Sequence, residues 1–299
     1  WQDGRPYLNG LRYNTIGDSA MALAAFRAGE VDIYEPTEVQ VPLVENQSGF
    51  SLQTWSNPTY SYFQINRTMA PTNDIKVRKA LSMAVDRKAL VNLILGERGI
   101  PIYGPIVPAF GWAFDPDFKK YAYDPVESKR LLAEAGYPDG FDLDPVVWYG
   151  GLSAKPRMEA LQQMFAKVNV NLELLQLANS VASKGYQIEW KYPAYSSSLG
   201  PRTELHILMT EHFLPDKPKN VGHTVIPGYV ALADQAKATY DLAERAKIYQ
   251  QMQEKVVEDM MMMMFLYATN GNEAFWDYLK DYKPHPGRQP SFVNTWIDK

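Results

Sequence analysis

Strand-like and helical segments alternate along this chain, and this alternation restricts its fold more than any other feature. Residues 59–66 (TYSYFQIN) alternate aromatic and polar side chains, which is typical of a strand. Residues 73–96 follow with apolar side chains at helical spacing; Asn73 or Asp74 can cap a first helix there, and Asp86 a second. Strands separated by capped helices predict an α/β lobe.

The same pattern extends over most of the chain. Near the N-terminus the predicted order is a strand in 4–16, a helix in 20–29 and a strand in 31–34. Further predicted elements are a helix from Asp124, strands in 143–150, 169–177 and 292–297, and helices in 158–168, 230–240 and 242–259.

Five consecutive methionines stand at the start of MMMMMFLYA, residues 260–268. This segment has the length and bulk of a buried strand, and methionine is an adaptable core residue. In a strand the methionines would alternate between two faces, with Met260, Met262 and Met264 opposite Met261 and Met263. Thioethers also bind copper(I), but no His or Cys lies nearby to complete a site. We therefore interpret the run as core packing.

Composition excludes several classes of function. The 299 residues carry a net charge of −4, which offers no basic surface to nucleic acid. There is no cysteine, so disulfides and thiolate sites are ruled out. The longest apolar run, residues 260–268, is far shorter than the ~20 residues that cross a bilayer. No signal peptide is visible, yet the chain begins at Trp1, which predicts a processed, trimmed or partial sequence.

Motifs for catalysis are absent from the sequence. We find no dinucleotide-binding or P-loop glycine pattern, no nucleophile elbow and no H-E-x-x-H. The histidines are too irregularly spaced for two to share a metal on one helix face: His206, His212, His223 and His285. The sequence therefore predicts no catalytic residues, no metal site and no cofactor. The chain is predicted not to be an enzyme.

Two segments carry a family resemblance. Residues 73–91 (NDIKVRKALSMAVDRKALV) and 121–141 (YAYDPVESKRLLAEAGYPDGF) resemble, in order and spacing, the family 5 extracellular solute-binding proteins. These are the oligopeptide, dipeptide and nickel receptors of bacterial ABC importers. The resemblance extends over essentially the whole chain but covers only the C-terminal three-fifths of such proteins.

The resemblance implies a two-lobed, periplasmic-binding-protein-like α/β fold of type II, cluster C. By family architecture, residues 1–57 and 269–299 are portions of a discontinuous lobe 1, and residues 58–268 are a complete lobe 2. The implied function is capture of a peptide or other small polar solute in the interlobe cleft and delivery to ABC permease subunits. The implied location is the periplasm, or a lipid anchor at the outer face of the cytoplasmic membrane. A missing N-terminal portion of the same protein is a further expected partner.

On this reading the lobe 2 wall of the cleft is predicted to carry aromatic, amide and hydroxyl side chains: Tyr62, Gln64, Trp148, Tyr149, Tyr195, Ser196 and Ser198. Tyr62 and Trp148 are equally compatible with core positions, because the sequence does not determine which strand face is buried.

One departure bears on the ligand. In oligopeptide receptors an aspartate shortly after a tryptophan pairs with the peptide's α-amino group; here Tyr195 stands near the tryptophan position and Ser198 near the aspartate. Without that carboxylate a cationic terminus loses roughly 1.5–3 kcal/mol. We therefore expect a ligand without a free amine there, such as a sugar, an opine or a blocked peptide, unless Glu189 takes the role.

Two other functions stay open on sequence grounds. One is a two-lobed hydrolase or transferase, which would require a convergent nucleophile or acid–base pair. The other is a fragment that works only with a separate N-terminal chain.

Overall fold

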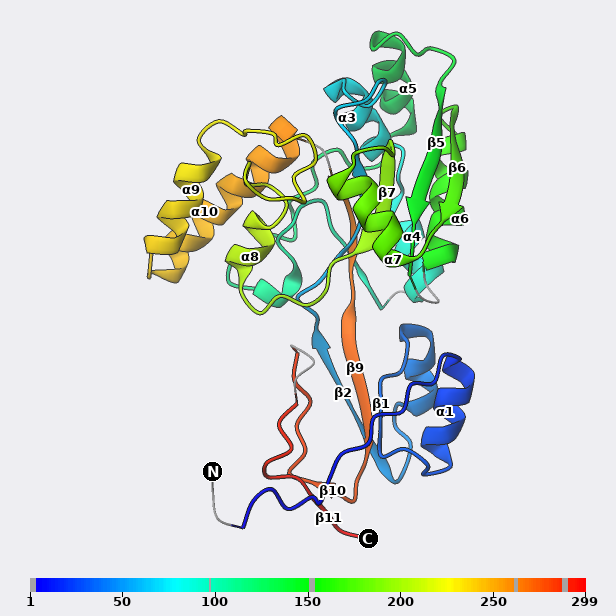
Figure 1. Cartoon of the computed structure of the whole chain (residues 1–299), viewed down its shortest axis with the longest axis vertical. Helices are drawn as coiled ribbons and strands as arrows, with labels where there is room; N and C mark the ends of the chain where they lie inside the picture. The colour runs from blue at the N-terminus through cyan, green and yellow to red at the C-terminus, as the bar shows by residue number, and fades with distance from the viewer. Residues whose placement is uncertain (1–3, 97, 151–153, 261–262, 287–289) are drawn as a thin grey trace. The chain divides into compact units, whose positions relative to one another are not determined.

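The computed structural model describes residues 4–96, 98–150, 154–260, 263–286 and 290–299 (Figure 1). The chain divides into two compact units. Unit 1 comprises residues 1–58 and 269–299, and unit 2 comprises residues 59–268. The assignment of these units to a partial lobe 1 and a complete lobe 2 stays a prediction.

Unit 2 is built on a six-stranded mixed sheet with the order β4-β8-β3-β7-β5-β6. In that order the strands are Ile100–Pro101, Met263–Ala268, Ser61–Ile65, Ala194–Ser198, Phe141–Trp148 and Val170–Gln176. β3 pairs antiparallel with β7 and β8, whereas β5 pairs parallel with β6 and β7. The strands predicted in 59–66, 143–150 and 169–177 are confirmed as β3, β5 and β6.

Both faces of this sheet are buried, and β3 shows it most clearly because all five of its residues are inaccessible. Tyr62 points into one hydrophobic core, together with Tyr195 of β7. Phe63 and Ile65 point into a second core on the opposite face. A strand buried on both sides needs a nearly continuous apolar or aromatic sequence, which YFQI supplies apart from Gln64.

Two groups of helices cover the two faces of the sheet. On the Phe63 face lie α3 (Ile75–Met83), α4 (Arg87–Leu95), α5 (Pro125–Glu134) and α6 (Ala154–Ala166). On the Tyr62 face lie η2 (Pro108–Phe110), α7 (Asn179–Ser183), η3 (Lys184–Ile188), α8 (Leu205–Thr210), α9 (Tyr229–Ala238), α10 (Leu242–Lys255) and η4 (Val256–Met260). No helix in the described ranges is long and apolar enough to cross a membrane.

Helix starts follow the predicted capping residues. The Asp74 carboxylate accepts from the Lys76 amide at 2.7 Å and begins α3, and Asp86 accepts from the Ala89 amide and begins α4. Asp124 accepts from two amides at the start of α5. Each carboxylate satisfies backbone donors that have no partner within the helix, so these predictions are confirmed.

Two buried arginines of the segment 73–91 hold the helices to the rest of unit 2. The Arg78 guanidinium donates to the carbonyls of Thr72 and Asn73 at 2.9 and 2.8 Å. The Arg87 guanidinium donates to the Phe265 carbonyl of β8 at 2.7 Å. Burial lowers the pKa of both groups to about 10. Carbonyl acceptors satisfy Nη1 of Arg78 and Nε of Arg87.

The methionine run enters the sheet later than predicted. The chain continues from α10 into the π-helical turn η4, which ends at Met260, and β8 begins at Met263. Met263 packs into the core of the Tyr62 face and Met264 into the opposite core, so the predicted alternation is confirmed for these two residues. The side chain of Met260, and residues 261–262, lie outside the described part of the chain.

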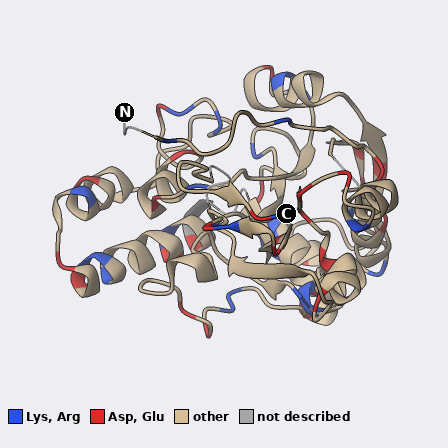
Figure 2. Cartoon of the chain, turned by 90° about the horizontal axis from the view of Figure 1, so that it is seen from below, with Lys and Arg blue, Asp and Glu red and all other residues tan. Residues whose placement is uncertain are grey.

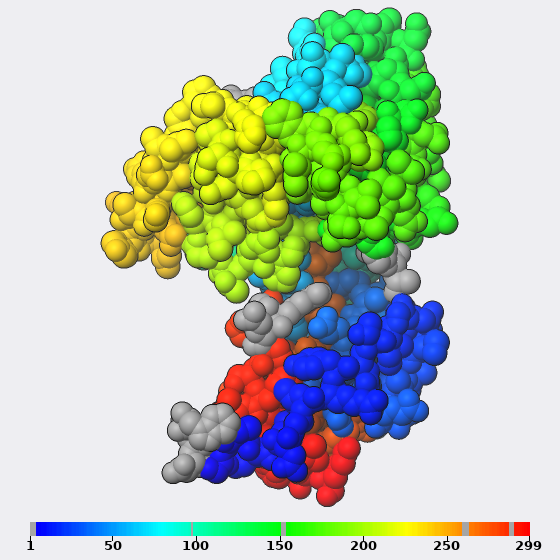
Figure 3. Space-filling model, viewed as in Figure 1, coloured from blue at the N-terminus to red at the C-terminus, as the bar shows by residue number. Residues whose placement is uncertain are grey.

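Unit 1 has a three-stranded sheet of order β1-β9-β2 and a two-stranded pair, β10-β11. Its strands are β1 (Ile33–Tyr34), β2 (Phe50–Ser56), β9 (Asn270–Trp276), β10 (Leu279–Lys280) and β11 (Trp296–Ile297), and its helices are α1 (Ser19–Arg27), η1 (Glu38–Gln40) and α2 (Val41–Val44). Its cores are small, and the larger one centres on Phe26 and Ala274. The N-terminal segment lies against the C-terminal one (Figure 3), where Arg5 donates to Asn294.

The predicted strand in 4–16 is wrong. This segment has no regular secondary structure, and Tyr13 is 82% exposed. A strand requires a hydrogen-bonded neighbour, and none of the described strands pairs with this segment. The strand predicted in 292–297 is also shorter than expected, because only Trp296 and Ile297 pair with β10.

Two leucines of α4 provide a matched test of this packing. Leu90 is fully buried in the core on the Phe63 face, whereas Leu93 is 66% exposed on the same helix. We expect Leu90→Ala to lower the free energy of unfolding by about 2–5 kcal/mol, because it leaves a cavity. Leu93→Ala should change it by less than ~0.5 kcal/mol. Denaturant unfolding of both variants measures the difference, and equal losses would contradict the packing.

Candidate functional site

Six of the seven predicted ligand-binding residues lie on three adjacent strands of unit 2, and the seventh, Tyr149, directly follows β5. β3 and β7 pair in a register that sets Tyr62 opposite Ser197 and Gln64 opposite Tyr195. β5 and β7 pair with Trp148 beside Ser196. The sheet therefore brings the predicted residues together, but strand alternation divides them between its two faces.

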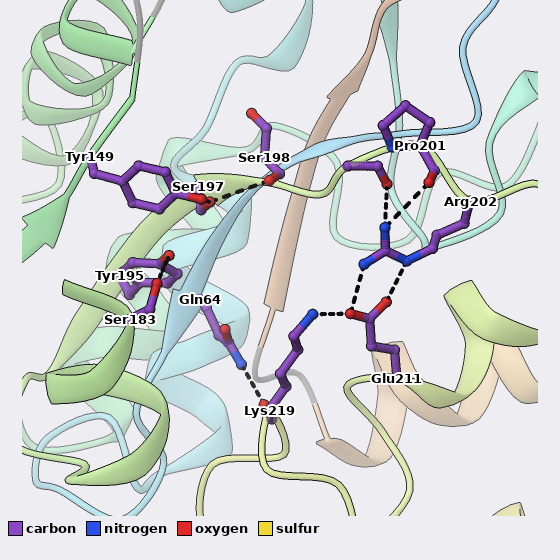
Figure 4. Close-up of polar contacts among 11 residues, drawn as sticks. Gln64, Tyr149, Ser183, Tyr195, Ser197, Ser198, Pro201, Arg202, Glu211 and Lys219 are labelled. Atoms are coloured by element: carbon purple, nitrogen blue, oxygen red, sulfur yellow. Dashed lines mark hydrogen bonds and ion pairs between the residues drawn. The ribbon is translucent and has the colours of Figure 1, made fainter. Parts of the chain in front are cut away.

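One face carries a cluster of tyrosines. The Tyr195 ring stacks on Tyr186 at a centroid distance of 5.1 Å and on Tyr149 at 6.1 Å. The Tyr62 ring lies 6.3 Å from the Tyr195 ring. The Ser197 hydroxyl donates to the Tyr149 hydroxyl at 3.0 Å (Figure 4). We call these five residues the tyrosine face.

Burial decides the electrostatics of the tyrosine face. Tyr62, Tyr186 and Tyr195 are buried, whereas Tyr149 is half-buried. Burial raises the pKa of Tyr62 well above its ordinary value and raises the pKa of Tyr195 to about 12. These phenols therefore stay neutral and act as hydrogen-bond groups with apolar rings. Of the tyrosine face, Tyr149 is the residue that reaches the surface of unit 2.

The opposite face holds Trp148, Ser196 and Ser198. The sequence is compatible with either a cleft position or a core position for Trp148. The structure places Trp148 in the core on the Phe63 face. The Ser196 hydroxyl is buried and donates to the Tyr62 carbonyl at 3.1 Å. Ser198 is exposed. Tyr62 likewise takes its alternative core position, and a ligand-binding role for either aromatic residue stays a prediction.

Gln64 is completely buried at the centre of β3. Its amide nitrogen donates to the Lys219 carbonyl at 3.2 Å, while its amide oxygen has no partner among the residues that the structure describes. Figure 4 shows it beside an ion cluster in which Arg202 donates to Glu211 at 2.8 and 2.9 Å and Lys219 donates to the same carboxylate. Burial and the neighbouring Arg202 lower the pKa of Lys219 to about 8. This cluster anchors the loop after β7.

Sequence reasoning missed two residues that the sheet places beside the predicted ones. Ser197, not Ser196 or Ser198, shares the tyrosine face, and the two-residue period from Tyr195 could have shown this. Arg157, in the first turn of α6, lies beside Ser198 at 3.3 Å. Nothing in the local sequence separates this arginine from a surface residue.

Glu189 was the alternative partner for a ligand amine. Its carboxylate already pairs with Lys191 at 2.8 Å and with Lys184 at 3.4 Å. Hydrogen bonds from these two lysines lower its pKa. This acid therefore has two cationic partners within unit 2.

Charges of both signs are interspersed over the molecule (Figure 2), in keeping with the small net charge. Within the described ranges, no three His, Asp or Glu side chains gather closely enough to hold a metal ion.

Unit 1 has an open hollow of about 1000 Å³, lined in part by Arg5, Tyr7 and Trp296. None of the seven predicted residues lines that hollow.

Comparison with known proteins decides the family. Residues 1–220 match the family described as "Bacterial extracellular solute-binding proteins, family 5 Middle". The chain belongs to this family. The predicted recognition is thereby confirmed.

Curated relatives include the glutathione-binding protein GsiB of Escherichia coli K12 and of Shigella flexneri serotype 5b. Each is 27% identical over 272 residues, which are 87% of this chain and 52% of the relative. The chain thus spans about half the length of the curated relatives it matches.

Solved structures show the same fold. AgaA from Agrobacterium tumefaciens R10, in complex with agropinic acid, has a TM-score of 0.83 and 22% identity over 100% of this chain and 62% of its own. The dipeptide-binding protein of Pseudoalteromonas sp. SM9913, in complex with Met-Leu, has a TM-score of 0.80 and 20% identity over 96% of this chain and 58% of its own. The predicted periplasmic-binding-protein-like α/β fold is confirmed.

His212 gives a pH test of the core beneath the tyrosine face. Its ring lies 5.8 Å from Tyr62 and is fully buried, and neither ring nitrogen has a partner in the part of the chain that the structure describes. Burial, aided by Arg202, lowers its pKa to about 3. The unfolded chain therefore takes up the proton first, and stability falls as the pH drops from 6.5 towards 3, by at most ~1.4 kcal/mol per pH unit.

Above pH 6.5 this contribution is constant. We expect His212→Leu to flatten the decline between pH 6.5 and 4.5 in urea unfolding. The pKa of His206 is also lowered, but His206 is present in both proteins and cancels in the comparison. An unchanged pH dependence in the variant would disprove the buried neutral imidazole.

Proposed function

We propose that this chain is part of an extracytoplasmic receptor of an ABC importer that captures a small polar solute and delivers it to the permease. The family match over residues 1–220 is the observation that carries this proposal. Relatives whose names state a role are binding proteins rather than enzymes. The proposed location is the periplasm, or the outer face of the cytoplasmic membrane through a lipid anchor.

The proposed mechanism is closure of two lobes on the solute. Unit 2 supplies one wall and unit 1, with the rest of lobe 1, supplies the other. The solute favours the closed form because it contacts both walls only there, and this differential affinity shifts the equilibrium. No covalent step is required.

The ligand class follows from the chemistry of the wall. Tyr149 offers a ring and a hydroxyl group at the surface of unit 2, and the buried Ser197 hydroxyl donates to the Tyr149 hydroxyl from below. A ring and a neutral hydroxyl suit stacking and neutral hydrogen bonds. Ser198 stands near the position where oligopeptide receptors carry an amine-binding aspartate, and Glu189 already has two lysine partners. We therefore propose a solute without a free amine at this position: a sugar, an opine or a blocked peptide.

Calorimetric titration of a solute panel tests this function. The panel contains sugars, opines, dipeptides and the same dipeptides with acetylated N-termini. We expect at least one solute class to bind, with acetylated dipeptides equal to or better than free ones. A strong preference for free amines would rule out the proposed ligand class, and the absence of any binding to the full-length protein would rule out the receptor function.

A variant pair locates the site within the same experiment. Tyr149→Ala should weaken binding of the selected solute roughly fivefold to tenfold, because a ring and a hydroxyl are lost. Tyr240→Ala is the matched control, since Tyr240 is 96% exposed between α9 and α10. Equal effects of the two variants would place the ligand elsewhere.

We further propose that an N-terminal portion of the same protein covers unit 1. Large apolar side chains are exposed near both termini of the chain: Tyr7, Leu11, Tyr13, Val293, Trp296 and Ile297. Tyr7 and Trp296 also line the open hollow of unit 1. An apolar surface beside such a hollow fits a protein partner that buries it.

Hydrogen exchange tests this cover. In a longer protein that includes the N-terminal portion, the backbone amides of 7–13 and 293–297 should exchange more slowly than in the 299-residue chain. Amides of β3, buried within unit 2, serve as the internal control and should not change. Equal exchange of 7–13 and 293–297 in both proteins would contradict the proposal.

A further inference from the structure

Arg157 is a buried cation with no acidic partner among the described residues. This residue is 2% exposed, and its Nε has no hydrogen-bond partner within the described ranges. Its Nη1 lies 3.3 Å from the Ser198 hydroxyl and 3.4 Å from the hydroxyls of Ser61 and Tyr267. In the described part of the chain no ion pair includes it. A buried charge without a counter-ion is costly, so a site of this kind favours an anion.

The other buried arginines of unit 2 show what a purely structural arginine looks like. Arg78 and Arg87 donate to backbone carbonyls at 2.7–2.9 Å, and a carbonyl can only accept. Arg157 instead meets three hydroxyls at longer distances, each of which carries a proton of its own. Nε of Arg78 also lacks a partner among the described residues, but Nη1 of Arg78 has two carbonyl acceptors. Arg157 has no carbonyl acceptor among those residues, so its guanidinium is the less completely satisfied one.

Hydrogen-bond donors outnumber acceptors around Arg157. The Ser61 and Ser198 hydroxyls bond to each other at 2.8 Å, which uses one of their two protons and leaves the other. The only described contact of the Tyr267 hydroxyl is the one in which it accepts from Arg157, so its proton is also unused. The indole N–H of Trp148, next to Ser196 on the same sheet face, is buried and unpartnered.

Two further features favour negative charge at this place. Arg157 lies in the first turn of α6, and a helix N-terminus carries a positive partial charge. Ser198 is exposed, so the group of hydroxyls reaches the surface of unit 2 at the end of β7. The site is thus a donor-lined position around a guanidinium, with access through Ser198.

We propose that Arg157, with the hydroxyls of Ser198, Ser61 and Tyr267, binds an oxyanion of the solute, a carboxylate or a phosphate group. This inference deepens the proposed receptor function and rests on it. Arg157 provides the charge, and the uncommitted hydroxyl protons complete the coordination of the anionic oxygens. The same guanidinium repels a cationic amine at Ser198, in line with the missing carboxylate there.

Acetate and inorganic phosphate are direct probes of this site. In the 299-residue chain, the Arg157 Nε–Hε resonance, assigned by its loss in Arg157→Lys, should shift saturably with one of them and not with chloride at equal ionic strength. Whichever probe acts identifies the group as carboxylate or phosphate. No saturable shift with either probe would overturn the inference.

Paired solutes extend the test to the bound ligand. For a solute found in the panel, the acid should bind roughly tenfold to a hundredfold more tightly than its amide or dephosphorylated form. Arg157→Gln should abolish that preference, and Tyr267→Phe, which keeps the ring, should reduce it. Arg130→Gln removes an equal charge from the exposed side of α5 and should leave it unchanged.

The outcomes separate the two proposals. If a solute binds but its acid and neutral forms have equal affinity, the anion site is wrong and solute capture stands. If acetate or phosphate shifts the Arg157 resonance while no solute binds to the full-length protein, the anion site stands and the receptor function is wrong. A preference for the acid that survives in both Arg157→Gln and Tyr267→Phe overturns the assignment to Arg157.

Discussion

The pairing of β3 with β8 is the contact on which unit 2 depends. β3 has neighbours on both edges and cores on both faces, so all five of its residues are buried. Arg87 reinforces the pair, because it ties the start of α4 to the Phe265 carbonyl of β8. Every predicted ligand-binding residue lies on β3 or on the two strands that continue the sheet from it, or directly follows one. The packing of this core therefore determines where the predicted ligand-binding residues of unit 2 lie.

Local signals in the sequence predicted the elements they control. Asp74, Asp86 and Asp124 each begin the helix expected of them, because a cap needs only the next few amides. The segment 4–16 has the alternation of a strand but no partner strand, and alternation alone cannot supply one. β2 and β9 were not predicted at all, although their pairing organises unit 1.

The same distinction applies to the candidate site: local sequence predicts some of its features, and others depend on contacts between distant segments. A family resemblance and an aromatic pattern were enough to select three neighbouring strands, yet the face of each residue depends on packing. Ser197 was overlooked beside two predicted serines because the buried side of β7 is decided by Tyr195 and its partners. Arg157 became visible only when α6 was placed over Ser61 and Tyr267, which are distant from it in sequence.

The location of β3 and β8 near opposite ends of unit 2 has a consequence for biosynthesis. β3 emerges from the ribosome early, and its final neighbour β8 is among the last segments of the unit to be made. Until then an aromatic strand lacks a partner along one edge, and such edges promote misassociation. The sheet can be completed only after nearly all of unit 2 has been translated, so its assembly is delayed by long-range contacts rather than by its helices.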